Sequence, residues 1–189
     1  MQKTPEQILA EELARGDRQA MKDLYGLYSG YLHTICSRYI TDRDAVRDVL
    51  QDSFVKIFSS VDKFRYRGKG SLKAWMGKIV VNQSLKYLQK AVKTDFIVHP
   101  EVLPDIPEDS DESPVLANIP QPVIYEMIRR LPDGYRTIFN LYVFEDKSHK
   151  EIASMLGIKE NSSASQLHRA KAMLAKWINE YREKTGASQ

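Results

Sequence analysis

The hydrophobic side chains of this chain recur at helical spacing in two separate stretches, and no stretch alternates as a strand would. The first stretch opens near Asp17, from which an apolar stripe keeps the helical period for five turns to Tyr39. Thr41 or Asp42 is expected to cap a second helix, which reaches Val61. The pattern contains neither an internal repeat nor an Asn-Gly hairpin, so it predicts an all-α protein.

Three further helices follow from the same periodicity. A loop over 62–70 leads into a helix that Ser71 would cap and that would run to about Ala91. The second stretch opens with helices expected over 123–131 and 133–144.

The stretch from Ser148 to Leu174 has the pattern of a helix-turn-helix. Ser148 and Glu151 form an S-x-x-E capping box, which predicts the start of a short helix. Gly157 supplies the left-handed residue at which that helix can stop. A second helix is expected to restart near Ser162 and to carry an apolar stripe on one face.

The polar face of that second helix is a candidate DNA-reading surface. Ser165 and Arg169 are expected to point away from the apolar stripe, because successive helical residues turn by about 100°. Ser162, Gln166 and His168 would flank them. Such side chains are suited to base edges and phosphates in the major groove. An ordinary helical hairpin with a solvated outer face would give the same pattern.

Composition bounds the class of protein. Of the 189 residues, 42% are hydrophobic and 28% are charged, which is ordinary for one large globular domain or two small ones. No apolar run approaches the roughly 20 residues of a membrane span, and no hydrophobic leader follows Met1. The single cysteine, Cys36, excludes an internal disulfide and is expected in a helical core, so a reducing cytoplasm is the expected location.

Charge divides the chain into three parts. Residues 1–93 carry 17 Lys and Arg against 10 Asp and Glu, and residues 123–189 carry 11 against 8. Between them, residues 94–122 carry seven acids, no Lys or Arg, and six of the eight prolines. Such a composition disfavours a helix and is typical of an extended, mobile linker. We therefore expect two basic helical domains, 1–93 and 123–189, joined by an acidic linker.

The segment from Lys63 to Lys93 has the composition of a surface for unpaired nucleic acid. It holds nine Lys and Arg, no acid, and four aromatic residues. Basic side chains neutralise phosphates, and aromatic rings stack on unpaired bases, a contact worth about 1–3 kcal/mol per base. A solvated basic helix is the alternative for the charged residues, and Trp75 is as well suited to the core as to DNA.

The helix expected over 42–61 carries the opposite charge. Asp44, Asp48 and Asp52 fall on one face with Gln51 beside them. A row of carboxylates suggests a protein partner with a basic surface, although a solvated helix face gives the same pattern. No His or further carboxylate falls at ligand spacing, so neither a metal nor another cofactor is expected. The four His are scattered and no catalytic motif is present, so we expect no enzyme activity.

Four segments closely resemble the extracytoplasmic-function sigma factors of bacterial RNA polymerase. They are LYGLYSGYLHTICSRYITDRDAVRDVLQDSFVKIF, KFRYRGKGSLKAWMGKIVVNQSLKYLQK, LPDGYRTIFNLYVFEDKSHKEIASMLGI and SQLHRAKAML. Their order and spacing, with the acidic linker between the second and the third, make the resemblance specific over nearly the whole chain. It implies a promoter-specificity subunit whose partners are core RNA polymerase and promoter DNA, with an anti-sigma factor as a further candidate partner.

In that family the first helical domain opens the promoter −10 element, and the C-terminal helix-turn-helix reads the −35 element. The resemblance implies core polymerase binding by Asp48, Gln51 and Asp52. The residues it implies for −10 DNA are Phe64, Arg65, Tyr66, Ser71, Trp75, Lys78, Asn82 and Lys86. Those it implies for −35 DNA are Ser162, Ser165, Gln166 and Arg169. The acidic linker resembles the segment that threads the polymerase active-site cleft and RNA exit channel.

A second hypothesis is a helix-turn-helix transcriptional regulator that acts without being a polymerase subunit. Residues 1–93 would then form a sensing or dimerising domain. A sensing domain should offer a ligand pocket or receiver-type carboxylates, and neither is evident from the sequence. An unopposed basic run with aromatic residues suits melted DNA better than a dimer seam, which would need apolar residues facing outward. The sequence therefore favours the sigma factor.

Overall fold

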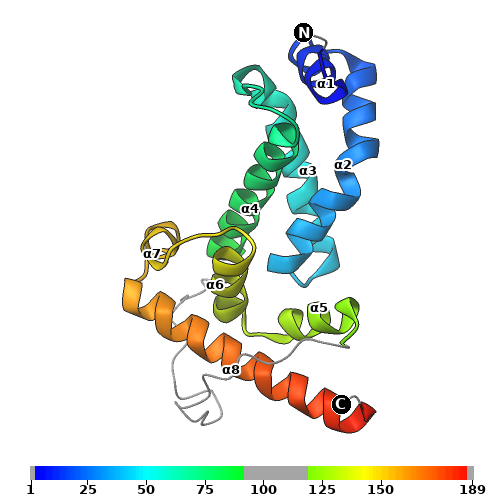
Figure 1. Cartoon of the computed structure of the whole chain (residues 1–189). Helices are drawn as coiled ribbons and strands as arrows, with labels where there is room; N and C mark the ends of the chain where they lie inside the picture. The colour runs from blue at the N-terminus through cyan, green and yellow to red at the C-terminus, as the bar shows by residue number, and fades with distance from the viewer. Residues whose placement is uncertain (1–2, 92–118, 187–189) are drawn as a thin grey trace. The chain divides into compact units, whose positions relative to one another are not determined.

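The computed structural model describes residues 3–91 and 119–186 (Figure 1). Every regular element in these residues is a helix, which confirms the predicted all-α class. The chain forms two compact units, Met1–Val92 and Lys93–Gln189. Most of the acidic linker expected over 94–122 lies outside the described residues. Among the described helices, none combines the length and the apolar composition that crossing a lipid bilayer requires.

The first unit is built from three long helices, one short helix and a turn. These elements are α1 (Pro5–Ala14), α2 (Arg18–Tyr39), α3 (Arg43–Ser60), the 3-10 turn η1 (Val61–Lys63) and α4 (Ser71–Ala91). Helix α2 begins next to Asp17, as expected, and of the two residues expected to cap α3 it is Asp42 that does so. The side chains of Asp17 and Asp42 each accept a hydrogen bond of 2.8 Å from the N–H three residues on. Helix α4 packs against both α2 and α3 (Figure 1).

The core of the first unit lies where α4 meets the two earlier helices. Leu24 of α2, Ile57 of α3 and Met76 of α4 are fully buried there. Burial of each such side chain stabilises the fold by about 2 kcal/mol. Gly77 lets α4 approach α2 closely, because a Cβ at that position would lie 3.2 Å from Cδ1 of Ile35. The predicted apolar stripes therefore meet in one core.

Cys36 lies in this core, as expected, with none of its surface exposed. Burial raises the pKa of its thiol to about 11, even though the Ser84 hydroxyl, 3.6 Å from the sulfur, acts to lower it. The thiol therefore stays protonated and acts as a small packing group.

Helix α1 was not expected from the apolar pattern. Thr4 caps it by accepting a hydrogen bond of 3.2 Å from the N–H of Gln7, and Pro5 occupies its first turn. Gly16 follows its end with a φ of +77°. Those three signals are present in the sequence, and with them the helix could have been predicted.

The second unit contains four helices. They are α5 (Gln121–Arg130), α6 (Asp133–Val143), α7 (His149–Leu156) and α8 (Glu160–Thr185). The linker prediction was wrong at its C-terminal end, because Ile119 is buried and Pro122 lies in the first turn of α5. Proline is compatible with that turn, where a backbone N–H has no helical partner.

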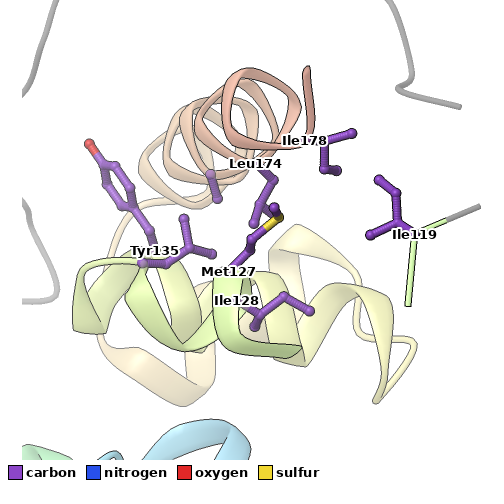
Figure 2. Packing of buried hydrophobic residues seen from close by; sticks show 8 residues of the cluster. Ile119, Met127, Ile128, Tyr135, Leu174 and Ile178 are labelled. Atoms are coloured by element: carbon purple, nitrogen blue, oxygen red, sulfur yellow. The ribbon is translucent and has the colours of Figure 1, made fainter. Parts of the chain in front are cut away.

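The core of the second unit lies between α5 and α8. Figure 2 shows the side chains of Met127, Leu174 and Ile178 gathered between these helices, with Ile119 at one end of the cluster. Tyr135 of α6 belongs to the same cluster and is fully buried. These contacts involve the middle of α8, and α6 and α7 also pack against this helix.

Candidate nucleic-acid interfaces

One face of α4 carries the side chains implied for −10 DNA. Ser71, Trp75, Lys78, Asn82 and Lys86 follow one another at intervals of three or four residues, which places them on a single face. The last three are exposed. Neither lysine forms an ion pair with any of the described residues. This face is therefore positively charged and open to a ligand.

Phe64 and Trp75 pack against each other where the loop meets this helix. Their ring centroids are 5.3 Å apart and their planes are tilted by 48°. Both side chains are half-buried. Trp75 thus lies at the edge of the core, with part of its ring accessible, rather than wholly in the core or wholly in solvent.

Arg65 and Ser71 take part in the internal structure of the loop. The Arg65 guanidinium donates to the carbonyl oxygens of Asp62, at 2.8 Å, and Phe64, at 3.0 Å. The Ser71 hydroxyl accepts from the backbone N–H of Arg67 at 3.2 Å. The prediction that Ser71 caps α4 was wrong, since Ser71 is the first residue of that helix and its hydroxyl holds the loop.

The capping role belongs to Glu6, which sequence reasoning missed. Its carboxylate accepts hydrogen bonds of 2.6 Å from the N–H of Gly70 and the N–H of Leu72. Beside it, the hydroxyls of Thr4 and Tyr66 lie 2.8 Å apart, within hydrogen-bonding distance. No local pattern marks these contacts, because the partners are 62 to 66 residues apart in the chain.

The carboxylate row of α3 is exposed, as expected. The exposed fraction of the side chain is 81% for Asp44 and 73% for Asp48, and Asp52 and Gln51 are also exposed. Arg47 stands within the row, 3.2 Å from the carboxylate of Asp44 and 3.9 Å from that of Asp48. Arg47 therefore partly neutralises Asp44 and Asp48, whereas no described residue forms an ion pair with Asp52.

Next to this row lies an apolar groove between α2 and α3 that sequence reasoning also missed. It has a volume of about 710 Å³, and its lining includes Tyr25, Leu50, Phe54, Val55 and Phe58. Tyr25 is 57% exposed and Val55 is 62% exposed, unusually high values for such side chains. An apolar groove is suited to the apolar face of a partner helix, and Arg43 and Arg47, which also line it, are suited to acidic residues of that partner.

The helix-turn-helix has the predicted caps. The Ser148 hydroxyl accepts from the N–H of Glu151, and the Glu151 carboxylate accepts from the N–H of Ser148, which completes the capping box. Hydrogen bonds from Lys147 and Ser148 lower the pKa of Glu151 to about 2. Gly157 has a φ of +69° and ends α7, as expected. The turn is therefore set by contacts within a few residues.

Helix α8 presents a smaller polar face than expected. Ser165 is exposed, and its hydroxyl donates to the carbonyl oxygen of Ser162 at 3.2 Å. Arg169 is half-exposed. The prediction that Gln166 flanks the exposed polar face was wrong, because that side chain is only 4% exposed. It follows buried Ser163 by three residues, so the helical repeat places both on the inner face of α8.

The start of α8 also differs from expectation. The helix begins at Glu160 instead of near Ser162, so the polar residues lie within its first turns. Nδ1 of His149 lies 3.0 Å from the Ser163 hydroxyl, which joins the start of α7 to α8. The ring of Tyr142 stacks on His149 with centroids 4.9 Å apart. The contact between His149 and Ser163 fixes α8 against α7, and Ser165 and Arg169 lie on the outer side of α8.

Known proteins resemble this chain in both units. The family model for sigma-70 region 2 matches residues 24–94, and that for sigma-70 region 4 matches residues 122–174. An ECF RNA polymerase sigma-E factor of Haemophilus influenzae is 25% identical, with 89% of this chain and 93% of the relative covered. The ECF RNA polymerase sigma factor SigW of Bacillus subtilis is also 25% identical, with 90% and 95% covered. The two family models thus coincide with the two candidate DNA-binding units.

Among solved structures, that of CnrH in complex with the cytosolic domain of CnrY is similar to this chain with a TM-score of 0.48 and 20% identity. The match covers 92% of this chain and 96% of that one.

Proposed function

This chain belongs to the extracytoplasmic-function sigma factors of bacterial RNA polymerase, and from that membership we propose how its two units divide promoter recognition. As a sigma factor, it is a promoter-specificity subunit that binds core RNA polymerase, recognises the −35 and −10 elements and helps to melt the DNA. The polymerase supplies the chemistry of RNA synthesis. A regulator that acts outside the polymerase is not favoured.

The first unit binds and opens the −10 element. The observation that carries this proposal is the exposed face of α4, where Lys78 and Lys86 flank Asn82 without an acidic neighbour on the helix. Phe64 and Tyr66, in the adjoining loop, and Trp75 offer aromatic surface to an unpaired base. Arg65, also in the loop, and Ser71, at the start of α4, contribute at the same end of this surface. Basic side chains that can bind phosphates and aromatic rings that can stack on bases then lie on one surface, and strand opening requires both.

The second unit reads the −35 element in the major groove. Ser162, Ser165 and Arg169 lie in the first turns of α8, the part of a recognition helix that reaches base edges. Arg169 is the residue suited to a bidentate contact with guanine. Gln166 is excluded from this face by its burial.

The acidic face of α3 binds the core polymerase through Asp48, Gln51 and Asp52, and the apolar groove beside it extends the contact. An anti-sigma factor would act by covering one of these surfaces. The protein is expected in the cytoplasm, where polymerase and promoters are found. The linker is proposed to thread the polymerase cleft, and most of it lies outside the described residues.

Transcription with purified core polymerase tests this function. The template is a library of barcoded DNA fragments with randomised −35 and −10 regions, transcribed by core enzyme with and without this protein. We expect transcripts only with the protein, from templates that share sequence at both elements. Binding of this protein to duplex DNA with no stimulation of transcription would instead indicate a regulator outside the polymerase.

A further inference from the structure

We propose that Glu6 of α1 is a positioning residue for −10 recognition, because its carboxylate fixes both the end of the loop 64–70 and the start of α4. The inference rests on the proposed function of the first unit. It assigns a role in promoter selectivity to a helix that contributes none of the side chains proposed to touch DNA.

The geometry at the start of α4 supports this role. The first N–H groups of any helix lack helical acceptors, and a carboxylate placed there accepts from them and complements the helix dipole. Helix α4 has no acid in its own first turn. Glu6 supplies the missing carboxylate, with one oxygen 2.6 Å from the N–H of Gly70 and the other 2.6 Å from that of Leu72. Because two oxygens bond two separate N–H groups, they fix the orientation of the start of α4 as well as its distance from α1.

The loop depends on this contact because its own backbone is permissive. Gly68 and Gly70 have φ values of +122° and +87°. Glycine adopts such values without strain but also adopts negative φ values about as easily, so these residues do not by themselves hold the loop in one conformation. The hydrogen bond between Thr4 and Tyr66 forms a second link to the same turn of α1. Thr4 also caps α1, so both links come from a turn that is itself held rigid.

The proposed DNA-binding side chains lie on either side of the Glu6 contact. Tyr66 precedes it in the loop, and Trp75 follows it one turn into α4. Base selection requires the two to keep a fixed relative position, whereas attraction to phosphates depends mainly on charge. Loss of the Glu6 carboxylate should therefore lower selectivity at −10 without lowering general affinity for DNA.

The test uses the full chain bound to core polymerase and the barcoded template library randomised over both −35 and −10. The variant Glu6→Gln keeps the size of the side chain but loses the charge and one of the two acceptors. Glu12→Gln, on the same helix, is the matched control for charge, since its side chain makes no hydrogen bond to the loop. Transcript counts are normalised to the amount of assembled polymerase complex.

For Glu6→Gln, we expect the ratio of preferred to disfavoured −10 sequences to fall about fivefold, the factor that corresponds to one helix cap. The preference at −35, and both preferences of Glu12→Gln, should match those of the unaltered protein. Less assembled complex with an unchanged ratio would show that Glu6 only stabilises the fold, and an unchanged amount of complex with an unchanged ratio would show that the loop is held without it. Either result overturns the inference, whereas an unaltered protein with no −10 preference would overturn the proposed function itself.

Discussion

The two units hold their proposed DNA-facing surfaces by contacts of very different range along the chain. In the second unit the capping box joins residues three apart, and His149 meets Ser163 only 14 residues on. In the first unit, Thr4 and Glu6 bond to the loop and to the start of α4 across 62 to 66 residues. The helix-turn-helix can therefore be recognised from a short segment, whereas the −10 surface exists only when the whole unit has folded.

The units also differ in how they distribute charge. The first unit carries a row of acids on α3 and only basic charges on α4, and the two rows approach each other where Asp52 and Lys86 line one small pocket. In the second unit the proposed DNA-facing residues all lie on α8. This difference predicts that charge changes in the first unit act selectively on one partner or the other.

The largest effect is expected from reversing the acidic face. The double variant Asp48→Arg with Asp52→Arg should lower association with core polymerase about 100-fold or more, because it opposes a basic partner surface. Both side chains are exposed, so the stability of the fold should change by only about 0.5 kcal/mol per site. Co-elution with core polymerase measures the effect.

The matched control for that variant is Glu180→Arg with Glu183→Arg on α8, which makes the same change of charge at exposed positions of the second unit. Normal co-elution is expected for this control. Undiminished co-elution of the α3 variant would remove this face from the interface.

Promoter opening should depend on the first unit more than on the second. Tyr66→Ala and Asn82→Ala should each impair opening, with loss of base stacking at Tyr66 worth about 1–3 kcal/mol. Permanganate footprinting should show weaker thymine reactivity near −10 while the −35 footprint persists. Tyr66→Phe keeps the aromatic ring but removes the hydroxyl that bonds to Thr4, so this variant should retain most of the promoter opening. Normal reactivity in both alanine variants would contradict the assignment.

In the second unit, Arg169→Ala should weaken binding to −35 duplex by about 1–3 kcal/mol and relax the preference at one base position. The effect on transcription should be smaller than that of the −10 variants, because the contacts of the first unit remain. Binding to duplexes substituted one base at a time measures both quantities. An equal loss for every sequence would identify Arg169 as a phosphate contact.

The smallest effect concerns the acid stability of the helix-turn-helix. The pKa of Glu151 is lowered to about 2 in the folded chain from an ordinary 4.5, so the folded state favours its ionised form. Its contribution is fully present above pH 4.5 and is lost as the pH falls through about 2. Amide hydrogen exchange over 149–157 should be slower in the unaltered protein than in Glu151→Gln near neutral pH. The two should converge toward pH 2, and a constant difference would contradict this prediction.

Most of the helices could be predicted from the sequence, and part of the site could not. Asp17, Asp42, Ser148 and Gly157 marked helix ends correctly because each acts on groups within four residues of itself. The exposed row on α3 and the basic face of α4 followed from helical periodicity alone. Helix α1 was missed although Thr4 and its neighbours signalled it.

The remaining features depended on which residues of distant elements meet. Gln166 is buried because it falls on the side of α8 that packs against the other helices of the unit, and its polar side chain does not predict this burial. Ser71 does not cap α4, because its hydroxyl accepts from the N–H of Arg67 and the Glu6 carboxylate accepts from the N–H groups at the helix start. Periodicity and caps are decided by hydrogen bonds between near neighbours, so the sequence by itself determines them. Burial of a polar group and a cap from another helix arise only when packing brings distant segments together, so the tertiary structure alone decides them.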